Sequence, residues 1–277
     1  VIAWADDFTG SIIDYGAWPD QHRREFSLAD ANPTIQSLNP RAGLEGGLYA
    51  AMTALTDDLL GREWEREDGA MMKIERALID ANWGQSTEIV YQFCRESKFA
   101  GIVLPSHGRY VGASSKPMTE YRKQPGDRLG FNWMMPSVIK KRAVRHVIFD
   151  SNFWKSFVHA RLAVPTGDHG SLTLYGRVPG IHQLLAEHLT AEYRVKTSGR
   201  GRTVDEWKLK PEHHDNHWLD CLAGCAVCGS MLGCSLPEFG AVMQKKKGRI
   251  KLSERQGTHI TTAEPRKKLK LSDIRRK

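Results

Sequence analysis

The feature that most constrains the fold is a strand–turn–helix–strand unit between residues 71 and 104. Residues 71–79 read as an extended segment that ends in Asp80, and a helix is predicted after a short turn, from about residue 86 to residue 97. Residues 100–104 form a short continuous apolar run, which is typical of a buried parallel strand. Because such a crossover joins parallel strands, part of the sheet must be parallel, and the sequence predicts an α/β fold.

The remaining elements follow from the apolar periodicity and from turn residues. Strands are predicted at residues 1–4 and 11–15 as a hairpin, at 144–149, at 171–175, and in a second hairpin over 193–210. Helices are predicted at residues 44–60, 152–162, 181–189 and 215–232. Strands and helices therefore alternate through most of the chain, as a sheet flanked by helices requires.

Positive charge is concentrated in two segments. Residues 241–277 carry 13 Lys and Arg against 3 Asp and Glu, a net charge of +10, and residues 105–146 carry 9 against 2, a net charge of +7. Two basic segments on an otherwise acidic body indicate contact with a polyanion at specific places. We interpret residues 106–143 as a mobile basic loop and residues 237–277 as a basic, disordered tail after a folded domain over residues 1–236.

Four of the five cysteines fall within fourteen residues. Cys221, Cys225 and Cys228 are spaced as one stripe of a helix, so a zinc-binding module is one alternative. Structural zinc sites usually bring their ligands together through turns, whereas apolar residues interleave with these cysteines. The pattern therefore favours cysteines that pack in the core over cysteines that hold a metal.

Two carboxylates have positions that suggest chemistry. Asp80 directly follows an apolar strand, and the carboxyl ends of parallel strands form the crevice where α/β proteins bind ligands. Asp220 lies in the first turns of an otherwise apolar helix, where a buried carboxylate requires a partner such as a metal ion. Gly224, one turn later, is expected to let a strand or a substrate backbone come close.

The chemistry of these ligands indicates the metal and the reaction. Hard oxygen ligands suit Mg²⁺ or Mn²⁺ better than zinc. Carboxylates from a strand end and a facing helix, together with basic segments, are what two-metal phosphodiester cleavage needs. One ion generates the attacking hydroxide, and the other stabilises the leaving 3′ oxygen.

Other residues near these positions have structural interpretations. Asp215 is predicted to cap the last long helix, over residues 215–232. Asp150 is predicted to cap the helix over residues 152–162. Trp83 and Trp218 flank the two key carboxylates and are expected to pack in the core. Turn or solvent-facing positions are expected for Asp6, Asp7 and Asp14.

Five stretches carry a family resemblance: Ala77–Gly84, Val90–Arg95, Phe153–Phe157, Gly170–Tyr175 and Asn216–Leu222. Together they resemble the nuclease half of the large terminase subunit of lambda-like tailed bacteriophages, over residues 1–236. In this resemblance Asp80 matches the acid after the family's fourth strand, and Asp220 matches the acid on its C-terminal helix.

The resemblance implies an RNase H-like nuclease domain, with a mixed sheet flanked by helices, that cuts concatemeric double-stranded DNA during packaging. It implies an acidic active site that binds two Mg²⁺ or Mn²⁺ ions, with Asp80 and Asp220 as catalytic residues and metal ligands. The family's first acid lies on a first strand, which we expect to precede Val1. These residues contain no G-x-x-x-x-G-K-[ST] loop of an ATPase half. We therefore expect an incomplete nuclease that cleaves DNA poorly by itself.

Partners follow from the same resemblance and from the charge pattern. The predicted DNA contacts are Arg109, Lys116, Arg122, Lys123, Arg128, Lys140, Lys141, Arg142 and Arg145. Further implied partners are the small terminase subunit, the portal of the procapsid and the ATPase half of the same polypeptide, in the cytoplasm of the infected bacterial host. No run of about 18 apolar residues occurs, so no membrane contact is predicted. The alternative function is a non-catalytic nucleic-acid-binding or assembly module of a packaging motor, which would need neither Asp80 nor Asp220.

Overall fold

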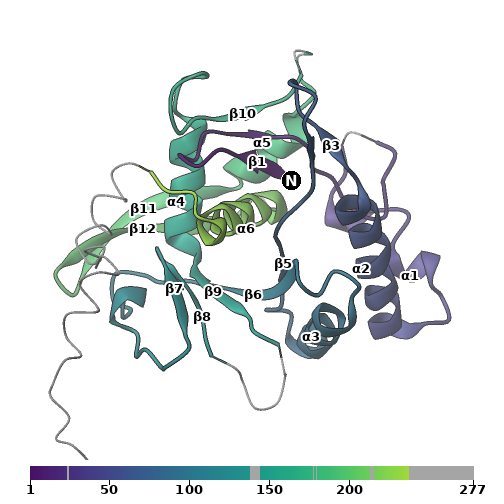
Figure 1. Ribbon diagram of the computed structural model, residues 1–277, viewed down its shortest axis with the longest axis horizontal. Helices are drawn as coiled ribbons and strands as arrows, with labels where there is room; N and C mark the ends of the chain where they lie inside the picture. The colour runs from purple at the N-terminus through teal and green to yellow at the C-terminus, as the bar shows by residue number, and fades with distance from the viewer. Residues whose placement is uncertain (24, 138–143, 177, 179, 213–214, 237–277) are drawn as a thin grey trace, which may run out of the picture. The chain divides into compact units, whose positions relative to one another are not determined.

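A five-stranded mixed sheet contains the predicted crossover. The computed structural model describes residues 1–23, 25–137, 144–176, 178, 180–212 and 215–236. The strand order is β5 (Ala77–Asp80), β6 (Val103–Arg109), β9 (Val147–Asp150), β8 (Trp133–Met135) and β7 (Arg128–Gly130). Strands β5, β6 and β9 run parallel, and β8 and β7 pair antiparallel beside them (Figure 1). The predicted β-α-β unit and α/β class are therefore confirmed.

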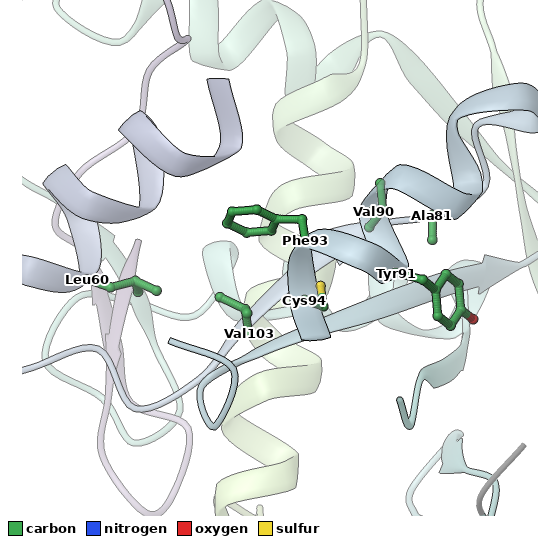
Figure 2. Packing of buried hydrophobic residues seen from close by; sticks show 7 residues of the cluster. All are labelled: Leu60, Ala81, Val90, Tyr91, Phe93, Cys94 and Val103. Atoms are coloured by element: carbon green, nitrogen blue, oxygen red, sulfur yellow. The ribbon is translucent and has the colours of Figure 1, made fainter. Parts of the chain in front are cut away.

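Helix α3 (Thr87–Glu96) joins β5 to β6 and covers one face of this sheet. Its apolar residues recur at helical spacing, so one stripe of the helix can be buried. Figure 2 shows this stripe packed against the strand residue Val103 and against Leu60 of helix α2 (Gly43–Gly61). The buried members of the cluster are Leu60, Ala81, Val90, Tyr91, Phe93, Cys94 and Val103.

The long helix α6 (His217–Leu232) covers the opposite face. Successive residues of a strand point to opposite faces of a sheet. Val103 packs beneath α3, whereas the next residue, Leu104, lines a cavity together with Met231 of α6. The two helices therefore enclose the sheet in a helix–sheet–helix arrangement.

Helix α6 also packs against a second sheet of three strands, β1 (Ile2–Trp4), β2 (Gly10–Ile12) and β10 (Leu172–Leu174). The contact is close because a Cβ atom at Gly229 would come within 2.9 Å of the Trp4 ring. Nothing lies within 4 Å of a Cβ atom placed at Gly224, so the expected close approach is made at Gly229 instead. Among the described strands, β1 and β5 lie at the edges of their respective sheets, and both contact α6.

The rest of the described chain surrounds these sheets. A long antiparallel hairpin, β11 (Glu192–Gly199) and β12 (Arg202–Leu209), confirms the predicted one and packs on helix α4 (Ser151–Leu162). The remaining elements are η1 (Leu28–Asp30), α1 (Ile35–Leu38), β3 (Trp64–Glu65), β4 (Met71–Met72), η2 (Gly84–Ser86), η3 (Met118–Glu120) and α5 (Gln183–Thr190). Among the described residues, no helix has the length and apolarity needed to cross a bilayer.

Two predicted segments differ from the structure. The extended segment predicted over residues 71–79 is two short strands in separate sheets, β4 and β5. The stretch predicted as a loop, residues 106–143, contains the end of β6 and all of β7 and β8 in its described part. The reason is tertiary packing, because Trp133, Met134 and Met135 are buried and β8 pairs with β9. By themselves, the Gly, Pro and basic residues of this segment predict a loop. The predicted tail, residues 237–277, lies outside the described residues.

Asp150 ends β9 and caps α4, as predicted. Its Oδ1 accepts a hydrogen bond of 3.1 Å from the backbone N–H of Phe153, which satisfies one donor of the first helical turn. Burial raises the pKa of Asp150 to about 6, against the lowering effect of hydrogen bonds from Phe153 and Asn152 and of the charge of Arg202. Desolvation therefore outweighs the hydrogen bonds at this cap.

The raised pKa of Asp150 predicts a pH dependence of stability. Between about pH 4 and pH 6 the folded protein retains a proton that the unfolded chain has released, so the free energy of unfolding should fall as the pH rises. A shift of about two pKa units corresponds to about 3 kcal/mol. Asp150→Asn keeps a capping side chain without a charge, so this part of the pH dependence should disappear in urea unfolding measured from pH 4 to pH 8. An unchanged pH profile in the variant would contradict the burial argument.

Candidate active site at the carboxyl end of the parallel strands

Asp80 is the last residue of β5, and its side chain is exposed. It pairs with Ser106 in the parallel register, which places it at the carboxyl end of the sheet. The Oδ1 atom accepts a hydrogen bond of 3.0 Å from the backbone N–H of Asn82. The turn is fixed further by the bond from the Ala81 N–H to the Ser106 carbonyl and by the Thr87 hydroxyl, which donates to the Ala81 carbonyl. The strand end and its turn therefore orient the carboxylate before any ligand arrives.

A hydrogen-bond network begins two residues after Asp80, at Asn82, and includes His107 and Tyr91. The Nδ2 of Asn82 donates to the Gly108 carbonyl, so its Oδ1 faces Nδ1 of His107 at 2.8 Å as an acceptor. This assignment makes Nδ1 of His107 a donor, and Nε2 of the same ring forms a hydrogen bond of 2.8 Å with the Tyr91 hydroxyl. Neither Asn82 nor His107 is predicted from the sequence. Their signal is position, because one lies two residues after Asp80 and the other near the end of the neighbouring strand.

Asp220 is held by a lysine that the sequence does not predict either. Nζ of Lys155, on α4, lies 2.8 Å from Oδ1 of Asp220 and 2.5 Å from Oε1 of Glu192, the first residue of β11. The Lys155 and Glu192 side chains are 10% and 5% exposed, whereas Asp220 is 54% exposed. Asn216 donates a further hydrogen bond to Glu192. The buried ammonium therefore fixes one oxygen of Asp220 and leaves the rest of that carboxylate open to solvent.

The two predicted carboxylates lie near one side chain of α6. Helix α6 packs on β5, and Cys221 follows Asp220. The Cys221 side chain is exposed. Desolvation, then Cys225, and then the negative charges of Asp220 and Asp80 raise the pKa of this thiol to about 12. Asp220 precedes this thiol on α6, and Asp80 of β5 lies within electrostatic range of it.

These donors match a divalent ion in kind but not in number. Carboxylate oxygens are ligands that Mg²⁺ and Mn²⁺ prefer. In the described part of the chain, no group of three or more His, Cys, Asp or Glu residues is arranged to hold a metal ion. Asp80 and Asp220 could contribute to such a site, which would need at least one more ligand.

Two nearby residues, Asp215 and Trp83, differ from their predicted structural roles. Asp215 does not cap α6, which begins after Asn216; its Oδ2 instead accepts from the Leu28 N–H at 2.9 Å. Trp83 is 54% exposed, so the prediction of core packing is wrong for it, because the turn after β5 directs it outward. Trp218 does pack, since it stacks on His188 at 4.5 Å between ring centroids.

The cysteines and the N-terminal acids complete this comparison. Cys228 is buried in the core as predicted, whereas Cys225 is half-buried and Cys221 is exposed. Asp7 accepts from the Thr9 N–H and contacts His169, and these interactions, in that order, lower its pKa to about 2. Asp7 therefore has the turn role expected for it.

The predicted DNA contacts are divided between two ends of the sheet. Arg109 is exposed at the end of β6, level with Asp150 and thus on the same side as Asp80. Arg128 and Arg145 lie at the opposite end, where β7 and β9 begin. Lys116, Arg122 and Lys123 are exposed between these strands. Lys140, Lys141 and Arg142 lie outside the described residues.

The chain matches one known family over most of its length. Residues 1–238 match the family described as the terminase large subunit gpA, endonuclease domain. The chain belongs to this family. No curated protein and no solved structure matches the chain in the same comparisons. The mixed sheet flanked by helices agrees with the RNase H-like fold that the resemblance implies for a terminase nuclease domain, and membership in a nuclease family points to a divalent metal cofactor.

The buried position of Lys155 in this terminase domain predicts a large effect on stability. Lys155→Met leaves the Glu192 carboxylate buried without its cation, which should lower the free energy of unfolding by about 3 kcal/mol in urea denaturation. Glu192→Gln in the same chain removes the unmatched charge, so the double variant should recover most of that loss. Lys73→Met, which breaks an exposed pair with Glu63, is the matched control and should change stability much less. Equal effects of the two lysine variants would contradict the role of the buried pair.

Proposed function

We propose that this chain is the metal-dependent endonuclease domain of a phage terminase, which cuts concatemeric double-stranded DNA during packaging. The observation that supports it best is that Asp80 ends a parallel strand and that Asp220 lies on the helix that packs against that same strand. Family membership supports the endonuclease activity and the packaging role. The small terminase subunit, the portal and an ATPase half of the same polypeptide are proposed partners.

The residues of the chain divide the work in this proposal. A bound pair of Mg²⁺ or Mn²⁺ ions would supply an activated water and charge stabilisation at the leaving oxygen. Asp80 and Asp220 would bind these ions, and Lys155 would hold the Asp220 carboxylate in one orientation through its contact at Oδ1. Asn82 orients Asp80 through its backbone N–H. The arrangement resembles other preorganised sites, where supporting hydrogen bonds fix the ligands.

A third carboxylate is required by the charge of two neighbouring ions, which repel each other. In the described part of the chain, β1 and β5 both present unpaired edges, and α6 contacts both strands. We propose that a strand from outside the described residues pairs between these edges and supplies that carboxylate. The alternative of a non-catalytic binding module gives no reason for a preorganised Asp80 or for the lysine that holds Asp220.

The catalytic proposal predicts the effect of two isosteric substitutions. Asp80→Asn and Asp220→Asn, made in the complete large-subunit polypeptide, should each abolish Mg²⁺-dependent cleavage of a DNA concatemer, because each loses a charged metal ligand. Thermal unfolding should show that both variants remain folded. Asp20→Asn, whose side chain is 77% exposed and contacts the neighbouring His22, is the matched control and should cut normally. Full cleavage by both variants would refute the assignment.

DNA contact by the basic segment predicts a change in salt dependence. Gln in place of Arg109, Arg122 and Lys123 should reduce the slope of log affinity against log salt by about 0.9 for each phosphate that is no longer neutralised. Duplex binding measured by fluorescence anisotropy at several salt concentrations would give both slopes. The same number of Gln substitutions at Arg23, Arg41 and Lys73 should leave the slope nearly unchanged. An unaltered slope in the first variant would assign this segment to another role.

A further inference from the structure

A small cavity lies at the end of the sheet opposite Asp80. Its volume is about 210 Å³. The lining residues are Arg76, Leu104, Arg128, Trp133, Met135, Arg145 and Met231. Arg76 directly precedes β5, Arg145 lies two residues before β9, and Arg128 is the first residue of β7. Three arginines from three separate parts of the sheet therefore line one cavity.

These arginines lack matching carboxylates in the described part of the chain. None of the three forms an ion pair there, although Asp127 lies within electrostatic range of Arg145. Both oxygens of Asp127 already accept backbone N–H groups, from Gln124 at 2.8 Å and from Ser137 at 2.6 Å. Within the described residues, Arg145 therefore has one carboxylate in electrostatic range, and Arg76 and Arg128 have no ion-pair partner.

Arg76 has donor capacity to spare. Its Nη1 donates to the Gly101 carbonyl at 3.0 Å, which anchors the guanidinium beside the cavity. Its Nε is buried and has no hydrogen-bond partner within the described residues. A buried donor without an acceptor is costly, so an acceptor from a ligand would be favourable here.

The other walls of the cavity strengthen binding of an anion. Met135 is buried and Trp133 is 8% exposed. The Trp133 ring lies directly over Gly130, where a Cβ atom would come within 2.0 Å of it, and its Nε1 donates to Ser230 of α6 at 3.0 Å. Apolar walls exclude water and lower the local dielectric, so a charge-assisted hydrogen bond is stronger there than at an open surface.

We propose that Arg76, Arg128 and Arg145 form a binding pocket for a phosphate group. Guanidinium groups bind phosphate oxygens in bidentate pairs, and three positive charges match a doubly charged phosphate better than they match a singly charged carboxylate. The pocket is separate from the candidate active site, because Arg76 directly precedes β5 and Asp80 ends it, four residues later, which is about 13 Å at roughly 3.3 Å per residue. The proposal does not depend on cleavage activity.

The phosphate could belong to the DNA backbone or to a free phosphate compound, and both present the same tetrahedral oxygens. A distance of about 13 Å from Asp80 corresponds to about four base-pair steps at 3.4 Å each, which is within one bound duplex. If the natural phosphate belongs to DNA, a duplex should compete with inorganic phosphate for the pocket. If it belongs to a free compound, a duplex should not compete. The experiment therefore needs both an inorganic and a nucleic-acid probe.

The test is to measure the binding of inorganic phosphate to the chain by calorimetry and by phosphorus NMR. Arg128→Gln, at an exposed side chain, and Arg76→Gln should each weaken phosphate binding about tenfold, the loss expected for a charged hydrogen bond. Arg41→Gln, an exposed arginine away from the cavity, is the matched control and should bind normally. Should Arg76→Gln fail to fold by circular dichroism, Arg128→Gln still decides the matter.

The second arm titrates a short DNA duplex into the phosphate-loaded protein. Release of phosphate by the duplex, with weaker duplex binding in Arg128→Gln, supports the pocket with DNA as the source. Phosphate binding that the duplex leaves intact supports the pocket with a free phosphate compound as the source. The proposal is overturned when phosphate does not bind at millimolar concentration, or when it binds equally to the wild type, Arg76→Gln and Arg128→Gln.

Discussion

The buried ammonium of Lys155 is the contact on which the candidate active site depends. It lies between Glu192 and Asp220 and thereby joins α4, the first residue of β11 and the first turn of α6. A buried charge is tolerated only when an opposite charge pairs with it. Here Glu192 and Asp220 supply the opposite charges, although they lie 37 and 65 residues after Lys155. The orientation of Asp220 is thus a consequence of this pairing as much as of helix packing.

Helix α6 connects two chemically different ends of the sheet. Its first turn carries Asp220 toward the acidic end, where β5 finishes in Asp80. Its last turn carries Met231 into the cavity surrounded by arginines. One helix therefore joins the proposed metal site to the proposed phosphate pocket. A nuclease needs both kinds of site, because its metal ions and its substrate have opposite charges.

The predictions that the structure corrects share one physical cause. Trp83 is large and aromatic, which predicts a core position, yet the turn after β5 directs it into solvent. Gly and Arg interrupt the pattern of residues 128–135, which predicts a loop, yet pairing with β9 makes part of this segment strand. Asp215 has the position of a helix cap, yet it bonds to Leu28, far away in sequence. In each case the tertiary surroundings, and not the neighbouring residues, decide the local structure.

Local pattern is sufficient for the crossover, the hairpins, the long helices and the capping role of Asp150, because periodicity and strand-end position follow from neighbouring residues. It also singles out Asp80 and Asp220, since a carboxylate at a strand end or in an apolar helix is conspicuous in sequence. Only the tertiary structure discloses Lys155, Glu192 and the cluster of Arg76, Arg128 and Arg145. Those side chains act through partners far apart in sequence, and folding alone brings such charges within range of one another.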